Sequence, residues 1–116
     1  MGSFQLAHPY LGCMVTVEVD RPLGSSHPTY GSVYPVNYGY VPGVLAPDGE
    51  TLDAYVLGIA EPLASFSGRC IAIAHRLDDD DDKLVLVPDG LDLSDAEVLS
   101  RIHFQEQFFH TVLLRA

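Results

Sequence analysis

The pattern of hydrophobic and polar residues predicts several short strands. Residues 14–19 alternate between valines and polar side chains, as in a strand with one buried face. Residues 69–76 also alternate, and the aspartate run after them turns the chain, so that residues 83–87 are predicted to return as the hairpin partner. Two further apolar stretches, residues 52–57 and 111–114, can add strands to the same sheet.

A helix is predicted late in the chain. A capping box begins at Ser94, and apolar side chains then recur at helical spacing, which predicts a helix over about residues 95–109. His103, Glu106 and His110 share one face of this helix, either as ligands of a transition metal or as ordinary polar residues on its solvent side. The apolar stripe consists of Val98, Leu99, Ile102 and Phe109.

Short strands, hairpins and a late helix together predict a mainly β (α+β) fold, a small twisted barrel with one C-terminal helix packed outside. With 47% hydrophobic residues, the chain can build one adequate core. No internal repeat or linker is visible, so we expect a single domain over residues 1–116.

The chain is strongly acidic, with 16 Asp and Glu against 6 Lys and Arg. This balance argues against nucleic acid as a partner and favours metal cations, which could bridge an anionic phosphate to the surface. No stretch reaches the roughly 20 apolar residues that span a membrane, and the N-terminus lacks the pattern of a secretory signal. We therefore expect a cytoplasmic protein without a membrane partner.

The most informative carboxylates lie in the sequence DGETLD. Asp48 opens a turn at Gly49, and Glu50 and Asp53 follow at the start of the strand expected from residue 52. These three side chains could face one small volume, where oxygen ligands favour magnesium, manganese or calcium. The alternative is a solvated acidic turn.

The residues before this turn suggest a family. The sequences YPVNYGY and DGETLD resemble the active-site segment of the soluble (type I) inorganic pyrophosphatases, whose pattern is Tyr-Pro-x-Asn-Tyr-Gly-Tyr followed by Asp-Gly-Asp-x-x-Asp. Residues 78–87, DDDDDKLVLV, look like the acidic turn and Lys-Leu strand of the same family. The chain would be a short, divergent member, and Glu50 departs from the pattern. The matching residues are Asn37, Tyr38, Gly39, Tyr40, Asp48, Gly49 and Asp53.

The resemblance implies an OB-like five-stranded barrel, a homo-oligomer, and hydrolysis of pyrophosphate to two phosphates by metal-activated water, with Mg²⁺ or Mn²⁺ as cofactor. Asp48 and Asp53 match carboxylates that hold the metals. Glu50 stands where the family has the aspartate that accepts the proton of water. Tyr38 matches a tyrosine that donates to a substrate phosphate or tunes the nucleophile, and Lys83 matches a lysine that contacts the phosphates.

The aspartate run, residues 78–82, adds two expected metal ligands. When the register is anchored on Lys83, the resemblance selects Asp78 on the incoming side of the turn and Asp81 on the outgoing side. The remaining three aspartates would lie at the tip. A solvated run of like charges is the alternative.

Other parts of the family pattern are missing. The family has a Tyr-Lys pair at the end of its helix, which grips a phosphate, and this chain offers Phe108 and Phe109 there. Upstream cationic residues have no certain match, and Arg21 is the best candidate substitute for binding phosphate, although an ordinary surface turn is the alternative. Loss of cationic donors can cost several kcal/mol in phosphoryl transfer.

Three functions follow. The first is metal-dependent hydrolysis of inorganic pyrophosphate. The second is phosphohydrolase activity on another phosphoanhydride or ester, because a smaller clamp leaves room for an organic group. The third is a noncatalytic metal-binding relative of the family, which the change at Glu50 and the two phenylalanines would favour.

Overall fold

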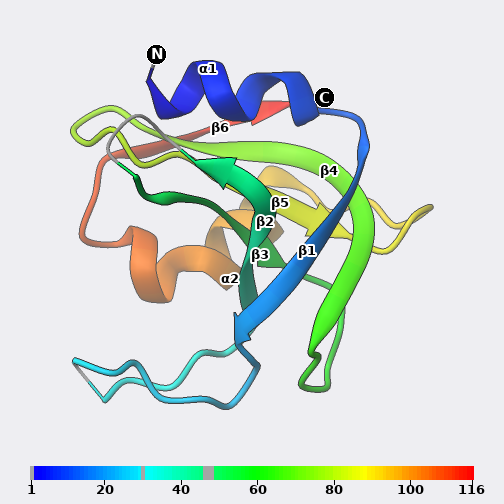
Figure 1. The fold of residues 1–116 in the computed structure, drawn as a ribbon, viewed down its shortest axis with the longest axis vertical. Helices are drawn as coiled ribbons and strands as arrows, with labels where there is room; N and C mark the ends of the chain where they lie inside the picture. The colour runs from blue at the N-terminus through cyan, green and yellow to red at the C-terminus, as the bar shows by residue number, and fades with distance from the viewer. Residues whose placement is uncertain (1, 30, 46–48) are drawn as a thin grey trace.

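The computed structural model describes residues 2–29, 31–45 and 49–116. Its centre is a closed barrel in which β1 pairs with β2, β2 with β3, β3 with β5, β5 with β4, and β4 again with β1 (Figure 1). A sixth strand pairs with β4 outside this ring. The strands are β1 (Met14–Arg21), β2 (Asn37–Leu45), β3 (Thr51–Val56), β4 (Ser65–Arg76), β5 (Lys83–Val87) and β6 (Thr111–Arg115).

Strand β4 closes the barrel because it is long enough to serve two neighbours along one edge. Its first residues pair antiparallel with β1, from Ser65 to Arg69, and its last residues pair with β6, from Ala72 to Arg76. On its other edge it forms the predicted hairpin with β5. Strands β3 and β5 run parallel to each other, so the barrel is mixed.

The alternation of side chains divides the apolar residues between two cores. One core fills the barrel and includes Val15, Val17 and Ala54. The other lies between the outer face of the sheet and helix α2 (Asp95–Glu106), and includes Tyr55 and Val85. Polar side chains on this outer face of β3 and β5 therefore point to the side on which α2 packs.

The helix confirms the predicted capping box. The Ser94 hydroxyl accepts a hydrogen bond from the backbone N–H of Glu97, and the Glu97 carboxylate accepts one from the backbone N–H of Ser94. The helix ends at Glu106 rather than at residue 109, and residues 107–109 turn toward β6, with the backbone N–H of Phe109 donating to the carbonyl of Glu106. The buried residues of its inner face are Val98, Ile102 and Glu106.

Two elements were not predicted from the sequence. A short helix, α1 (Ser3–Ala7), continues into the 3-10 turn η1 (His8–Tyr10) and lies across one end of the barrel (Figure 1), where Ala7 reaches the interior core. The second is β2, which occupies a segment that reads as turn-rich. No helix among the described residues has the length and apolar character needed to cross a membrane.

Candidate active site

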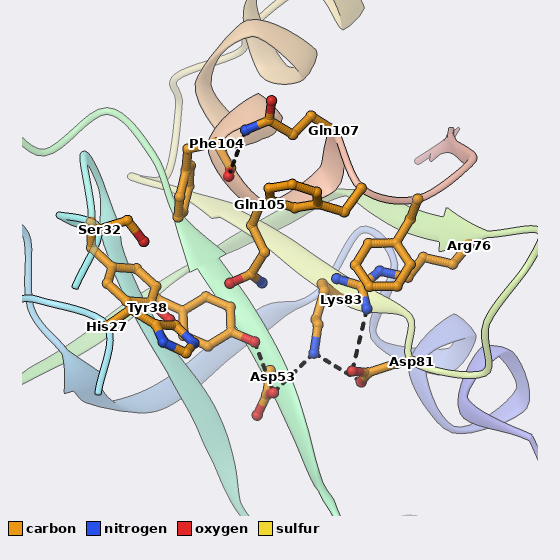
Figure 2. A pocket seen from close by; sticks show the side chains of 13 residues that line it. His27, Ser32, Tyr38, Asp53, Arg76, Asp81, Lys83, Phe104, Gln105 and Gln107 are labelled. Carbon is orange, nitrogen blue, oxygen red and sulfur yellow. Dashed lines mark hydrogen bonds and ion pairs between the residues drawn. The ribbon is translucent and has the colours of Figure 1, made fainter. Parts of the chain in front are cut away.

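A pocket of about 830 Å³ opens on the outer face of the sheet, beside the end of α2. Figure 2 shows a chain of polar contacts at one side of this pocket, running from Tyr38 through Asp53, Lys83 and Asp81 to Arg76. Aromatic and amide side chains form the rest of its wall. The lining residues are His27, Ser32, Tyr34, Tyr38, Asp53, Arg76, Asp81, Lys83, Phe104, Gln105, Gln107, Phe108 and Phe109.

Two of the predicted metal ligands meet at one ammonium group. The Nζ of Lys83 lies 3.0 Å from Oδ2 of Asp53 and 2.8 Å from Oδ1 of Asp81. The two carboxylates come from β3 and from the β4–β5 turn, and the parallel pairing of β3 with β5 brings these segments together. Lys83 is almost fully buried, so its charge is poorly solvated and the ion pairs compensate for this.

Asp53 is fixed by two further donors. The Tyr38 hydroxyl donates to Oδ2 at 2.8 Å, and the Thr51 hydroxyl donates to Oδ1 at 2.6 Å. Burial, followed by the charge of Asp53, raises the pKa of Tyr38 well above its ordinary value. The phenol therefore stays protonated at neutral pH and remains a hydrogen-bond donor.

Arg76 extends the network behind Asp81. Its Nη1 lies 3.4 Å from Oδ2 of Asp81 and 3.2 Å from Oδ2 of Asp79. Its guanidinium also stacks on Phe109, with Cζ 3.7 Å from the ring centroid. Nε and Nη2 bind the two carboxylate oxygens of Glu106. Arg76 is thus a cation in the pocket, held by an aromatic face and a buried carboxylate.

Sequence reasoning did not select Arg76, and it gave Glu106 a different role. Glu106 is not on the solvent side of α2 but buried, where Tyr55, Thr111 and Arg76 donate to it. Burial raises the pKa of Glu106, but these donors outweigh it and hold the pKa below its ordinary value. The alternation of side chains along β4 could have identified Arg76. Arg76 lies on the same face of the strand as Ala72 and Ala74, and that face packs on α2.

Two residues of the YPVNYGY motif have structural roles that explain their presence. Asn37 is fully buried; its Oδ1 accepts from the backbone N–H groups of Leu23 and Leu63, and its Nδ2 donates to the carbonyl of Glu61. A Cβ at Gly39 would lie 1.9 Å from the carbonyl oxygen of Glu18, so only glycine fits where β1 and β2 meet. Asn37 and Gly39 therefore hold the backbone on either side of Tyr38.

The five aspartates of the β4–β5 turn have separate partners. Asp78 accepts from the backbone N–H of His110 at 3.0 Å, which places its carboxylate against the α2–β6 turn rather than in the pocket. Asp80 accepts from the backbone and hydroxyl of Ser3 in α1. Asp82 is buried and lies 2.7 Å from Nδ1 of His75. Asp79 and Asp81 bind the cations described above. The run is therefore organised by specific contacts, not solvated throughout.

The other predicted site residues lie around this network. Glu50 is exposed and lines a second hollow of about 360 Å³ with Asp79–Asp82. Asp81 lines both hollows. Arg21 ends β1, and its charge counteracts the burial that raises the pKa of Tyr34 in the pocket wall. Asp48 falls outside the described residues.

The donor chemistry of this site suits a hard divalent cation, since Asp53 and Asp81 present carboxylate oxygens a short distance apart. Within the ranges that the structure describes, no group of three or more His, Cys, Asp or Glu is placed to hold a metal. Asp53 and Asp81 are therefore candidate ligands only, and the roles of all the predicted site residues stay predictions.

This protein combines a small mixed barrel and an outer helix with a carboxylate–lysine network and a neighbouring acidic turn. The sequence model for inorganic pyrophosphatase matches residues 14–112, and the chain belongs to this family. It is 32% identical to an inorganic pyrophosphatase of Saccharolobus solfataricus over 108 residues, a match that covers 79% of this chain and 60% of the relative. It is 42% identical to one of Nostoc over 66 residues, covering 52% of this chain and 38% of the relative. The chain therefore spans less than two thirds of the length of these relatives.

Solved structures agree with the fold. An inorganic pyrophosphatase from Ehrlichia chaffeensis superposes with a TM-score of 0.68 at 19% identity, covering 88% of this chain and 85% of that one. One from Neisseria gonorrhoeae superposes with a TM-score of 0.61 at 26% identity, covering 80% and 71%. The predicted OB-like five-stranded barrel with a C-terminal helix is confirmed. The strand expected over residues 111–114 is β6, which lies outside the ring, and α1 is an addition.

Proposed function

We propose that this chain hydrolyses inorganic pyrophosphate to two phosphates with a divalent metal ion, Mg²⁺ by preference. The observation that carries the proposal is the convergence of Asp53 and Asp81 on Lys83 at the pocket, in a chain of this family. Asp53, Asp81 and Asp48 would hold the metal, which supplies a water of lowered pKa and neutralises phosphate charge. The contact of Asp78 with His110 supports a structural role for that residue instead.

The chain's own residues then bind and orient the substrate. Lys83 has three N–H donors, more than its two ion pairs use, and can donate to a phosphate oxygen. The protonated Tyr38 hydroxyl fixes the orientation of Asp53. Glu50, at the rim of the acidic hollow, is the proposed acceptor of the proton of water. Arg76 supplies a cation where the family's Tyr-Lys pair is replaced by Phe108 and Phe109, and Arg21 is a further proposed phosphate contact.

Phosphate release from pyrophosphate, measured by malachite green with and without Mg²⁺, tests the proposal. Asp53→Ala should abolish release and weaken Mg²⁺ binding in titration calorimetry, because it removes a ligand and the partner of Lys83. Asp89→Ala, which removes an exposed carboxylate paired with Arg69 outside both pockets, is the control and should retain activity. Equal release by the wild type and Asp53→Ala would contradict the proposal.

The remaining expectations stay predictions as well. A single domain, a homo-oligomeric state and a cytoplasmic location were expected from the sequence and the resemblance. Size-exclusion chromatography with light scattering tests the second, and limited proteolysis tests the first, because one domain should resist cleavage as one unit.

A further inference from the structure

The pocket is much larger than its polar part. Its volume of about 830 Å³ is in the range that accommodates a drug-sized organic ligand, roughly 300–1,000 Å³. The charged groups that line it, Asp53, Lys83, Asp81 and Arg76, form one connected chain (Figure 2). A diphosphate bound at this chain would leave most of the pocket empty.

The rest of the wall is aromatic. Phe104, from α2, packs edge-on against Tyr34 with ring centroids 5.5 Å apart. His27 stacks on the same tyrosine, with ring centroids 6.2 Å apart. Phe108 lies at the pocket and is 75% exposed. An aromatic ring that remains exposed beside a pocket is a suitable surface for stacking a planar ligand, and each base–ring stack contributes substantially to binding.

Uncharged amides lie among these rings. The Nε2 of Gln105 donates to the Tyr55 hydroxyl at 2.9 Å, and the Nε2 of Gln107 donates to the carbonyl of Phe104 at 3.0 Å. Each amide also carries a carbonyl oxygen that can accept from an amino group on the edge of a base. A phosphate could use only the N–H groups of these amides, whereas a heterocycle would use the amide oxygens and the aromatic rings as well.

We propose that this pocket also accepts a nucleoside diphosphate, and prefers it to pyrophosphate, with its diphosphate at Lys83 and Arg76 and its base on the aromatic wall beside Phe108. This inference rests on the proposed hydrolytic function of the same site. The oxygen of water forms a bond to the terminal phosphorus while the bond from that phosphorus to the bridging oxygen breaks. The products are a nucleoside monophosphate, inorganic phosphate and one proton, which passes to the general base.

Steady-state hydrolysis of ADP and of pyrophosphate, both with Mg²⁺, tests this inference. We expect a lower KM for ADP than for pyrophosphate in the wild type. In Phe108→Ala the ratio of the KM for ADP to the KM for pyrophosphate should rise about tenfold, because a base stack is lost. Leu99→Ala is the matched control: it removes a 40% exposed apolar side chain of α2 that does not line the pocket, and should leave the ratio unchanged.

The outcomes separate the two proposals. Hydrolysis of pyrophosphate without hydrolysis of ADP would overturn the nucleotide inference and leave the proposed function standing. If neither compound is hydrolysed, the proposed function fails, and calorimetric titration with ADP and Mg²⁺ decides the inference. Binding that Phe108→Ala weakens about tenfold would support a nucleotide pocket, and absence of binding, or equal binding by the two proteins, would overturn it.

Discussion

Arg76 and Glu106 form a buried two-point ion pair, in which Nε lies 3.0 Å from Oε1 and Nη2 lies 2.8 Å from Oε2. Both residues are 5% exposed. The pair joins the last residue of β4 to the last residue of α2, and it places the remaining guanidinium nitrogen, Nη1, against Asp79 and Asp81. The orientation of the helix is thereby coupled to the acidic turn at the pocket.

Glu106→Gln should destabilise the protein by about 3 kcal/mol at pH 7, because a buried guanidinium loses its charged partner. The pKa of Glu106 is held below 4.5, so its contribution is fully present above about pH 4.5 and is lost as the pH falls through the lower folded-state value. Urea unfolding of both proteins at pH 7 and pH 3.5 measures this. The difference between them should be smaller at pH 3.5, and an equal difference at both would contradict the ionic role.

Tyr38→Phe should lower kcat for the proposed reaction about tenfold, because Asp53 loses the donor that orients it. Since burial and Asp53 raise the pKa of Tyr38, the phenol is protonated across the range in which the enzyme is assayed. The ratio of wild-type to variant kcat should therefore be constant from pH 6 to 9. Tyr10→Phe, in η1 and outside the pocket lining, is the control, and a ratio that falls as the pH rises would show that Tyr38 ionises.

The elements with strict alternation or capping signals were predictable. Strand β1, the β4–β5 hairpin and the start of α2 follow from local patterns that the packing reinforces. Strand β2 was missed because its first three residues, Asn37, Tyr38 and Gly39, are all buried, so its side chains do not alternate between buried and exposed. Pro42 and Gly43 then interrupt it, and its register with β3 shifts after Tyr40. The periodicity of the sequence alone cannot distinguish a strand that is buried on both faces from a buried helical segment.

The site was only partly predictable for a different reason. Asp53, Lys83 and Tyr38 belong to short motifs, so their proximity follows once the strands are paired. The pairing of Arg76 with Glu106 crosses 30 residues and leaves no local signal. In the aspartate run, the five side chains are identical, so the sequence does not show which of them faces the pocket. Only the folded positions of their partners separate Asp81, at Lys83, from Asp78, at the His110 backbone.

Glu50→Asp should raise kcat at least about threefold if Glu50 is the general base, since the shorter side chain restores the family's aspartate and small displacements of a catalytic group are costly. Glu50 is exposed, so the change in unfolding free energy should be within about 0.5 kcal/mol. Glu18→Asp, an exposed glutamate on β1 outside both hollows, controls for the substitution itself. An unchanged kcat in Glu50→Asp would contradict this assignment and favour a proton acceptor elsewhere in the acidic turn.

Gly39→Ala should prevent stable folding, or destabilise the protein by at least about 3 kcal/mol, because its Cβ would lie 1.9 Å from the carbonyl oxygen of Glu18 and backbone cannot move aside as a side chain can. Gly90→Ala is the matched control. Gly90 has a φ of +90° with no atom within 4 Å of an added Cβ, so it should cost about 1–2 kcal/mol from backbone strain alone. Thermal unfolding followed by circular dichroism compares the two variants. Equal losses would mean that β1 and β2 can separate at this point, and that the glycine of the motif serves the chain in some way other than close strand contact.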